Sequence, residues 1–279
     1  MLINSGTDNK IDPTLTDMSF VRCIHNGART VYLPGSSLKG VFRSRYEQLM
    51  RAFESPVCKL FSKESCSEAL KNKKSFDGTQ RYKASCAACR LFGNLSLGSR
   101  IAFADAYPDL SSPAPVLGRR HGVGINRITG AAAPGALFEM EVLESGVFDV
   151  EVRLTNFALY QLRLILWIVQ DIDDGLVTFG MGGTRGNGQM RLKDSTEVQL
   201  RYRLFDDSDV NRLRGYDAKD VGGSEIQSFP RNLFGRESQL KGLEEILRAL
   251  GLDDRETLRT AMRRESWENV LACQRKRNA

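Results

Sequence analysis

Two stretches of the chain place apolar residues at the three- and four-residue spacing of an amphipathic helix. In the first stretch these apolar positions are Leu38, Val41, Phe42, Tyr46, Leu49, Met50 and Phe53. The second stretch runs from Phe157 to about Asp173, and its apolar positions are Leu159, Leu162, Ile165, Leu166, Val169 and Ile172. Because 3.6 residues complete a helical turn, this spacing predicts two helices that each bury one face. Gly175 is expected to end the second helix.

Shorter apolar segments between and after these helices predict strands. Residues 100–106 alternate in the way a half-buried strand does. Residues 137–143 and 147–154 are expected to form a hairpin, because a Gly-containing turn separates them. Residues 188–193 and 198–204 have the composition of closing strands. The order strand, helix, strand, repeated twice, is that of a ferredoxin-like fold of the α+β class.

Three segments fall outside this repeated pattern. Residues 55–95 are polar and rich in cysteine, whereas residues 106–134 are rich in Gly, Pro and Arg and predict an irregular excursion from the core. We expect residues 1–204 to form one domain that contains both insertions. Residues 205–279 are expected to form a loop and a helical appendage, with one helix near 240–250 and another reaching Arg264. This appendage either packs on the sheet or docks a partner.

The composition is that of a water-soluble globular protein with a slight excess of positive charge. Of 279 residues, 41% are hydrophobic and 27% are charged, and 40 Lys and Arg residues face 34 Asp and Glu residues. This balance permits a polyanionic partner without requiring one. No apolar run is long enough to span a bilayer, and the first residues are not those of a signal peptide. We therefore expect a cytoplasmic protein that does not enter a membrane.

Residues 34–40, with the sequence Pro-Gly-Ser-Ser-Leu-Lys-Gly, predict an anion-binding corner at the start of the first helix. Pro34 ends the preceding strand, Gly35 lets the chain turn, and Ser36 or Ser37 is expected to cap the helix. The first N–H groups of a helix carry partial positive charge and bind phosphate groups. An ordinary helix cap without a ligand is the alternative.

Two other kinds of phosphate or acyl chemistry do not fit this segment. A P-loop places its Lys after Gly and before Ser or Thr, whereas Lys39 precedes Gly40 here. Serine acyl enzymes share the Ser-x-x-Lys spacing of Ser36 and Lys39, but the Ser-Asp-Asn and Lys-Thr-Gly elements of that chemistry are absent from the sequence. Nucleoside triphosphatase and acyl-enzyme functions are therefore disfavoured.

A second candidate for phosphate binding is the glycine-rich segment 180–188, which follows the second helix. It lacks the Gly-x-Gly-x-x-Gly pattern and does not follow a strand, so a dinucleotide site is disfavoured. Its N–H groups can line a phosphate backbone, and Arg185 adds positive charge. The candidate binding residues are Gly182, Gly183, Thr184, Arg185 and Gly186. A mobile surface turn is the alternative.

Four of the six cysteines fall within residues 55–95, at Cys58, Cys66, Cys86 and Cys89. The two-residue gap between Cys86 and Cys89 lets both thiolates reach one metal ion, and the other two cysteines complete a tetrahedral set. We predict structural Zn²⁺, since four cysteine ligands leave no position for a reacting water. A disulfide pair and a redox Cys-x-x-Cys are the alternatives, and the lack of an export signal disfavours the first.

Three of these motifs occur together and in order. The segments 34–40, 86–93 and 182–188 resemble those of the RAMP superfamily of CRISPR proteins, and the resemblance covers about residues 2–204. More narrowly, the chain is similar to the repeated backbone subunits of type III effector complexes. The resemblance implies a modified RNA-recognition-motif fold, a guide RNA held along a filament of subunits, and a thumb hairpin that interrupts the guide–target duplex. It also implies other effector subunits as partners, including copies of this chain or related RAMP subunits.

The resemblance also implies residue roles. It assigns target-RNA cleavage to Asp17, with Asp12 as a rival, where a carboxylate would orient the 2′-hydroxyl or hold a divalent cation such as Mg²⁺. It places the thumb within 106–134, where apolar side chains would wedge between bases. The cationic and hydroxyl candidates for RNA contact are Arg22, Ser36, Ser37, Lys39, Arg43, Arg45, Arg119, Arg120 and Arg127. Residues 1–4 are shorter than the family's first strand, which predicts an incomplete strand or one donated by a neighbour.

The expected function is therefore a guide-RNA-binding backbone subunit that cleaves complementary target RNA. A purely structural RNA-binding subunit is one alternative. A stand-alone nuclease that processes guide precursors is another, and such an enzyme would use a histidine acid/base pair. The sequence contains only two histidines, His25 and His121, and His25 is also a candidate for phosphate contact.

Overall fold

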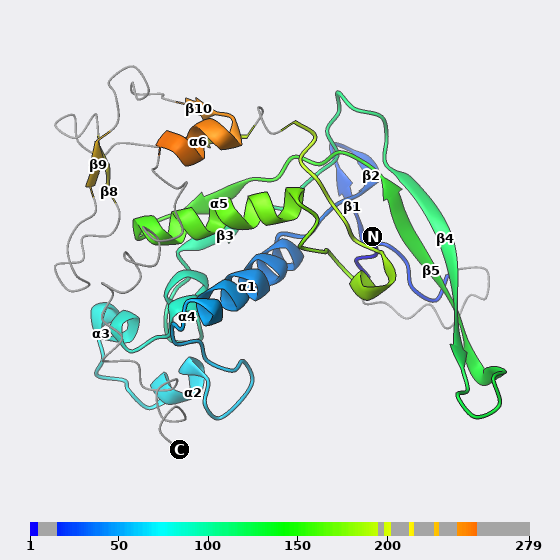
Figure 1. Cartoon of the computed structure of the whole chain (residues 1–279), viewed down its shortest axis with the longest axis horizontal. Helices are drawn as coiled ribbons and strands as arrows, with labels where there is room; N and C mark the ends of the chain where they lie inside the picture. The colour runs from blue at the N-terminus through cyan, green and yellow to red at the C-terminus, as the bar shows by residue number, and fades with distance from the viewer. Residues whose placement is uncertain (5–15, 195–197, 202–211, 215–225, 229–238, 250–279) are drawn as a thin grey trace. The chain divides into compact units, whose positions relative to one another are not determined.

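The computed structural model describes residues 1–4, 16–194, 198–201, 212–214, 226–228 and 239–249 (Figure 1). Asp12 and the predicted helix reaching Arg264 lie outside these residues. The chain divides into two compact units, and each is described by itself. Unit 1 comprises Met1–Val41, Phe103–Val152 and Ile172–Arg191, and unit 2 comprises the described residues of Phe42–Ala102, Arg153–Asp171 and Leu192–Ala279. Within the described ranges, every helix is too short or too polar to cross a membrane.

Both predicted long helices are present. Helix α1 spans Gly35–Ala52 and helix α5 spans Leu159–Asp173. On α1 the buried apolar residues follow the predicted spacing, and they are Leu38, Phe42, Tyr46 and Met50. Gly175 has a φ of 75°, and its N–H donates to Ile172 O at 3.0 Å, which ends α5 as predicted. Hydrophobic periodicity located both helices, but only α1 buries a stripe. On α5 every residue from Tyr160 to Leu166 is buried, including Gln161 and Arg163, so this helix buries more than the one face that the spacing predicts.

Strands β1 (Arg22–His25) and β2 (Ala28–Val31) form a short antiparallel hairpin in unit 1. The two residues between them are Asn26, with φ of 49°, and Gly27, with φ of 78°. Two successive positive φ angles match the right-handed twist of a two-residue hairpin, and Asn-Gly is the preferred pair for such a turn.

A second, much longer hairpin pairs β4 (Val116–Ile125) with β5 (Ala132–Ser145), seen as the two long green strands in Figure 1. The prediction that 106–134 is irregular and that 137–143 pairs with 147–154 is therefore wrong. Residues near 147–151 instead bond to the segment after β3, as in Asp149 N–H to Tyr107 O (3.2 Å) and Ala104 N–H to Glu151 O (3.1 Å).

Glycine explains this misreading of β4. A Cβ atom at Gly122 would overlap the Phe138 ring, and one at Gly118 would overlap the Glu144 carboxylate. The glycines of β4 therefore make room for large side chains of β5 that lie across the ladder. In the sequence alone, glycines at this density are typical of a loop.

Residues 1–4 are paired within this chain. Leu143 N–H donates to Met1 O, Val21 N–H to Ile3 O, and Met181 N–H to Leu2 O, at 2.7, 3.0 and 2.9 Å. The Leu2 and Ile3 side chains are buried. The segment thus occupies a strand position inside unit 1.

In unit 2 the predicted polar insertion is a set of three short helices. They are α2 (Cys66–Lys71), α3 (Gly78–Lys83) and α4 (Ala87–Phe92). Ser65 caps α2, and Asp77 with Gln80 forms a capping box at the start of α3. All six residues of α4 are buried. Part of this burial is against α1, since the Phe92 ring lies 5.4 Å from that of Tyr46. The low hydrophobicity of the segment did not suggest a buried helix.

The remaining elements are short. They are β3 (Ile101–Phe103), β6 (Val152–Leu154), the 3-10 turn η1 (Gly183–Arg185), β7 (Gln199–Arg201), β8 (Arg212–Arg214), β9 (Ile226–Ser228), β10 (Gln239–Lys241) and α6 (Leu243–Ala249). The predicted strand at 188–193 is reduced to a bridge between Thr178 and Gln189. The predicted helix near 240–250 is present as α6, and its Leu243 and Ile246 pack on Leu162 and Leu166 of α5.

Candidate RNA-binding surface and metal centre

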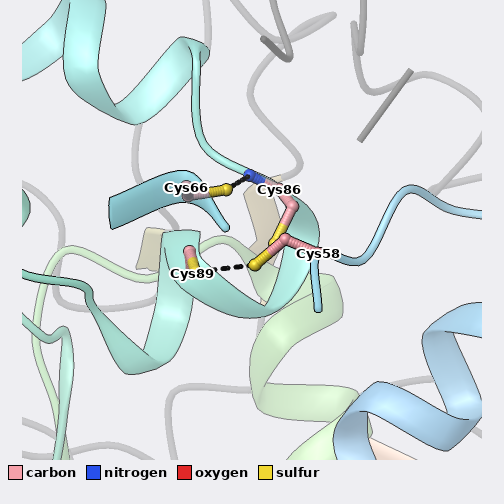
Figure 2. Close-up of side chains that lie close together, drawn as sticks. All are labelled: Cys58, Cys66, Cys86 and Cys89. Carbon is pink, nitrogen blue, oxygen red and sulfur yellow. Dashed lines mark hydrogen bonds between the residues drawn. The ribbon is translucent and has the colours of Figure 1, made fainter. Parts of the chain in front are cut away.

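Four cysteine side chains converge in the interior of unit 2 (Figure 2). Cys58 lies in the loop before α2, Cys66 is the first residue of α2, and Cys86 and Cys89 lie at the start and in the middle of α4. All four Sγ atoms lie within 4.8 Å of one another, and all four residues are buried. The spacing predicted from the sequence therefore brings together one set of four thiols.

The geometry of this cluster fits a tetrahedral zinc ion. A Zn–S distance of about 2.3 Å implies an S···S separation of roughly 3.8 Å in a tetrahedron, and Cys58 Sγ lies 3.7 Å from Cys89 Sγ. None of the described cysteines forms a disulfide, because such a bond would need sulfur atoms about 2.05 Å apart. The Cys86 N–H donates to Cys66 Sγ at 3.2 Å, which suits a thiolate.

The electrostatics of the cluster are unfavourable without a cation. Hydrogen bonding from Cys58, Cys66 and Cys86, followed by burial, raises the pKa of the Cys89 thiol. Four buried sulfurs cannot all ionise unless positive charge compensates them. A bound metal ion supplies that charge and requires deprotonated ligands. The four residues that would hold the ion are therefore Cys58, Cys66, Cys86 and Cys89.

Two arginines support this centre from outside the cysteine set. Arg43 of α1 donates to Cys89 Sγ at 3.4 Å, to Gly93 O at 3.3 Å and to Glu47 at 3.0 Å. Burial alone would lower the pKa of Arg43, but Cys89 and Glu47 outweigh burial and raise it. Arg43 was predicted to contact RNA, and the structure instead places it half-buried beside the sulfurs.

The second supporting arginine is Arg90, which sequence reasoning missed. Its side chain is buried, and its nitrogens donate to Tyr82 O, Ser85 O and Lys83 O at 3.0–3.2 Å. These carbonyls belong to the end of α3 and the turn that leads into α4. Arg90 thus fixes the chain that carries Cys86. The only sequence signal for a buried role of Arg90 was its position directly after Cys89. Other cationic residues of the same insertion, such as Lys71 and Lys73, lie at the surface.

The serine corner of unit 1 differs from its prediction in one respect. Helix α1 begins at Gly35, so exposed Ser36 and half-buried Ser37 lie inside its first turn and do not cap it. The cap is Asp105, whose Oδ1 accepts the Gly35 N–H at 2.7 Å. A carboxylate of this chain therefore occupies the position at Gly35 where a phosphate oxygen was expected. Lys39 is half-buried one turn further along α1.

The glycine-rich loop of unit 1 is a tight, hydrogen-bonded turn. Gly180, Gly182, Gly186 and Gly188 all have φ between 74° and 83°, which side chains with a Cβ atom rarely adopt. A Cβ atom at Gly180 would overlap Leu2 O, and one at Gly188 would overlap Phe179 O. These two glycines are thus explained by packing. Thr184, Arg185 and Gly186 remain exposed at the end of the turn, where an RNA backbone has access.

The long hairpin of unit 1 carries the other cationic candidates. Arg120 of β4 donates to Asn187 Oδ1 in the glycine-rich loop at 2.8 Å, so these two candidate RNA-binding segments are joined. Arg119 lies 4.0 Å from Glu139, and Arg127 is exposed in the turn of the hairpin. Large apolar side chains are also exposed there, namely Val123, Ile125, Ile128 and Leu137.

Asp17 lies at the surface beside β5. Its Oδ2 accepts the Glu139 N–H at 2.8 Å. Residues around it pair with β5, since Met18 N–H donates to Glu139 O (3.2 Å) and Glu141 N–H to Met18 O (2.9 Å). The predicted catalytic carboxylate is therefore held on the hairpin strand. His121 belongs to the same group, because its Nε2 lies 3.5 Å from Glu139 Oε1.

Arg22 and Arg45 have partners inside their own units. Arg22 makes a two-point contact with Glu141 at 2.6 and 2.8 Å, and Glu141 also accepts the Phe20 N–H at 2.9 Å. Burial opposes ionisation of Glu141, but these bonds outweigh it and lower its pKa. Arg45 donates to Asp171 at 2.8 Å. Both arginines were predicted to contact RNA, and in the structure both brace the protein.

Comparison with known protein families gives one match. The model of the RAMP superfamily matches residues 14–191, which is more than half of the chain. No curated protein matches the chain. The matched region contains Asp17, the serine corner, all four clustered cysteines, the long hairpin and the whole glycine-rich loop.

Proposed function

Because the chain belongs to the RAMP superfamily, we propose that it is a guide-RNA-binding backbone subunit of a type III CRISPR effector complex that cleaves complementary target RNA. The family itself indicates a CRISPR-associated, RNA-binding function, and it includes some ribonucleases. The subunit type and the cleavage activity are the finer parts of the proposal. Its partners would be guide RNA, target RNA and other effector subunits, including copies of this chain.

The observation that carries the proposal is the attachment of Asp17 to the long hairpin. Its carboxylate is held by the Glu139 N–H, on the strand opposite Arg119 and His121. The hairpin continues to an end with exposed Ile125, Arg127 and Ile128. Apolar side chains of this kind can wedge between stacked bases. A hairpin that opens a guide–target duplex would thus bring a target phosphate towards Asp17.

The chemistry proposed for Asp17 is activation of the 2′-hydroxyl next to the scissile phosphate. The carboxylate would orient this hydroxyl and accept its proton while the O2′–P bond forms. The P–O5′ bond breaks, and the 5′ oxygen takes a proton from solvent. If a Mg²⁺ ion takes part, Asp17 is the residue that would hold it together with RNA phosphates, because carboxylate and phosphate oxygens are ligands that Mg²⁺ prefers. That ion would neutralise charge on the phosphate.

The cysteine centre has a structural part in this proposal. Its four ligands are buried and leave no open coordination position, so a zinc ion there would stabilise unit 2 and take no part in cleavage. The cationic candidates that remain at the surface of unit 1 are Arg119, Arg120, Arg127 and Arg185. These residues, with Thr184 and Gly186, are the proposed contacts to the RNA backbone.

The test is cleavage of complementary RNA by the assembled complex with the Asp17→Asn variant. An Asn side chain keeps an oxygen that accepts the Glu139 N–H but loses the carboxylate, so the local structure is retained. We expect a fall in cleavage rate of about 100-fold or more, with unchanged guide binding. Asp149→Ala is the matched control, because Asp149 is an exposed aspartate of unit 1 outside the proposed site. Unchanged cleavage by Asp17→Asn would overturn the role of Asp17 and would leave cleavage to its rival Asp12 or to another subunit of the complex.

One observation favours a second candidate function, the stand-alone processing of guide precursors. His121 Nε2 lies 3.5 Å from Glu139 Oε1, and a carboxylate beside an imidazole is the arrangement of a general acid or base. Purified protein would then cut a guide precursor without other subunits, and His121→Ala would stop this. Failure of the wild-type protein to cut such RNA would eliminate this candidate.

A further inference from the structure

Three aromatic rings form a cluster on the surface of unit 1, outside the site described above. The rings of His25 and Tyr107 stack with a centroid separation of 3.6 Å and an interplanar angle of 10°. The Tyr32 ring lies 6.0 Å from that of Tyr107, at 22°. The cluster therefore consists of rings that are nearly parallel and come from three separate segments of the chain.

The strand register shows which face of the β1–β2 hairpin carries these rings. Cys23 pairs with Thr30 and His25 with Ala28, so these residues share one face of the hairpin. Tyr32 follows Thr30 by two residues and points to the same side. Val31, on the opposite side, is buried. His25, Tyr32 and Tyr107 are all half-exposed, so the rings lie on the outer face, at the boundary with solvent.

The backbone under the cluster is fixed by hydrogen bonds. Leu33 and Ala106 exchange two N–H to O bonds of 2.9 Å, directly beside Tyr32 and Tyr107. Tyr107 O also accepts the Asp149 N–H at 3.2 Å. A platform held in this way loses little conformational freedom when a flat ligand is added, which favours binding.

We propose that this cluster is a stacking site for one unpaired nucleobase of a bound RNA. The proposal rests on the RNA-binding function proposed above and adds a site to it. The 3.6 Å spacing of the existing rings is close to the roughly 3.4 Å step of stacked bases, so a base can continue the stack. Stacking on aromatic side chains is tolerant of sequence because every base has a π face.

The charge around the rings selects a base over a phosphate. Partial desolvation, and then the nearby Asp105 carboxylate, raise the pKa of Tyr32, so its hydroxyl stays protonated. Asp105 is exposed and would repel a phosphate placed at the same rings. A neutral, flat base has no such cost. The site therefore complements the cationic hairpin and loop, which bind the sugar-phosphate backbone.

The test measures binding of a 12-nucleotide single-stranded RNA to the full-length protein. Tyr107→Leu removes the aromatic face and should weaken binding about tenfold, whereas Tyr107→Phe keeps the ring and should change it little. Phe61→Leu is the matched control, since Phe61 is fully exposed in unit 2. In a series of RNAs that each carry one abasic residue, one position should lower the affinity of the wild-type protein. The same position should leave the affinity of Tyr107→Leu unchanged.

A second measurement needs no variant. Wild-type protein irradiated with 5-iodouridine-substituted RNA should yield a crosslink to His25, Tyr32 or Tyr107. RNA binding without such a crosslink, and with equal affinity for Tyr107→Leu, would overturn the stacking site and leave the RNA-binding function intact. Absence of any RNA binding by wild type would overturn the function as well as the site.

Discussion

The cysteine centre of unit 2 and the surface around Asp17 in unit 1 differ in how much of each site the protein supplies. All four cysteines are buried, and their Sγ atoms lie within 4.8 Å of one another, so one metal ion could contact all four. Asp17 is exposed and is held by a single bond to the Glu139 N–H. The folded chain therefore supplies every ligand of the cysteine centre. At Asp17, by contrast, bound RNA would have to supply the remaining groups of the site.

The two regions also use arginine differently. In unit 2, Arg43 and Arg90 are turned inward and bond to sulfur and to backbone carbonyls. In unit 1, Arg127 and Arg185 remain exposed. The positions of Lys and Arg in the sequence therefore do not by themselves locate an RNA-binding surface, since some arginines bond to cysteine sulfur and to backbone carbonyls inside the protein.

The largest expected effect is loss of unit 2 when one cysteine ligand is removed. Cys86→Ser should lower bound zinc from about one ion per chain to nearly zero and should cost several kcal/mol of unfolding free energy, because metal binding is coupled to folding. Zinc released on denaturation and thermal unfolding with and without a chelator measure this. Cys23→Ser is the matched control, since Cys23 lies in unit 1. If the wild-type protein held no zinc, or if Cys86→Ser were as stable as wild type, the cysteine cluster would not be a metal site that stabilises unit 2. The contrast with the surface around Asp17 would then be lost.

A smaller effect is expected for the ion pair that braces the Asp17 segment. Glu141→Gln breaks the two-point contact with Arg22 and should cost about 2 kcal/mol, seen by denaturant unfolding. The folded-state pKa of Glu141 is lowered, so its contribution is present above the ordinary pKa of Glu and is lost as pH falls through the lowered value. Wild type should therefore lose this stability in acid, and Glu141→Gln should lack that part of the pH dependence.

The corresponding control is Glu144→Gln, an exposed glutamate three residues further along the chain. Equal acid sensitivity of wild type and Glu141→Gln would show that this pair does not hold the segment. Asp17 would then be held on the hairpin by the Glu139 N–H and by the pairing of Met18 with β5, without support from the Arg22–Glu141 pair.

The smallest effect concerns the helix cap that replaces the predicted serine cap. Asp105→Asn keeps a weaker acceptor for the Gly35 N–H, so unfolding free energy should fall by about 0.5 kcal/mol. RNA affinity should rise, because a negative charge leaves the start of α1. Titration with labelled RNA at fixed salt checks this. An unchanged affinity would mean that the start of α1 lies away from the RNA and that the RNA-binding surface does not extend beyond the hairpin and the glycine-rich loop.

Sequence reasoning succeeded where the determinants are local. The long helices α1 and α5 follow from the spacing of their own apolar residues, and the cysteine cluster follows from a two-residue gap plus two further cysteines. The long hairpin could not be found in this way. Its pairing joins residues far apart in sequence, such as Arg119 and Glu141, and its glycines serve β5 side chains instead of turns.

The partners of the site residues were also beyond local reasoning. Asp105 caps a helix that begins 70 residues before it, and Glu141 holds Arg22 from 119 residues away. Arg43 faces sulfur because α1 and α4 lie together in the folded unit. In each case the sequence identified a charged residue, and only the fold identified what the charge contacts. The type of a residue predicts the chemistry of its side chain more reliably than it predicts which group that side chain contacts.

The central claim is that the hairpin and the glycine-rich loop of unit 1 form the RNA-binding surface. The most direct measurement is ultraviolet crosslinking of guide RNA in the purified, assembled complex, with the crosslinked peptides identified by mass spectrometry. We predict crosslinks within residues 116–145 and 180–188. A complex without RNA, or crosslinks confined to residues of unit 2, would contradict the account.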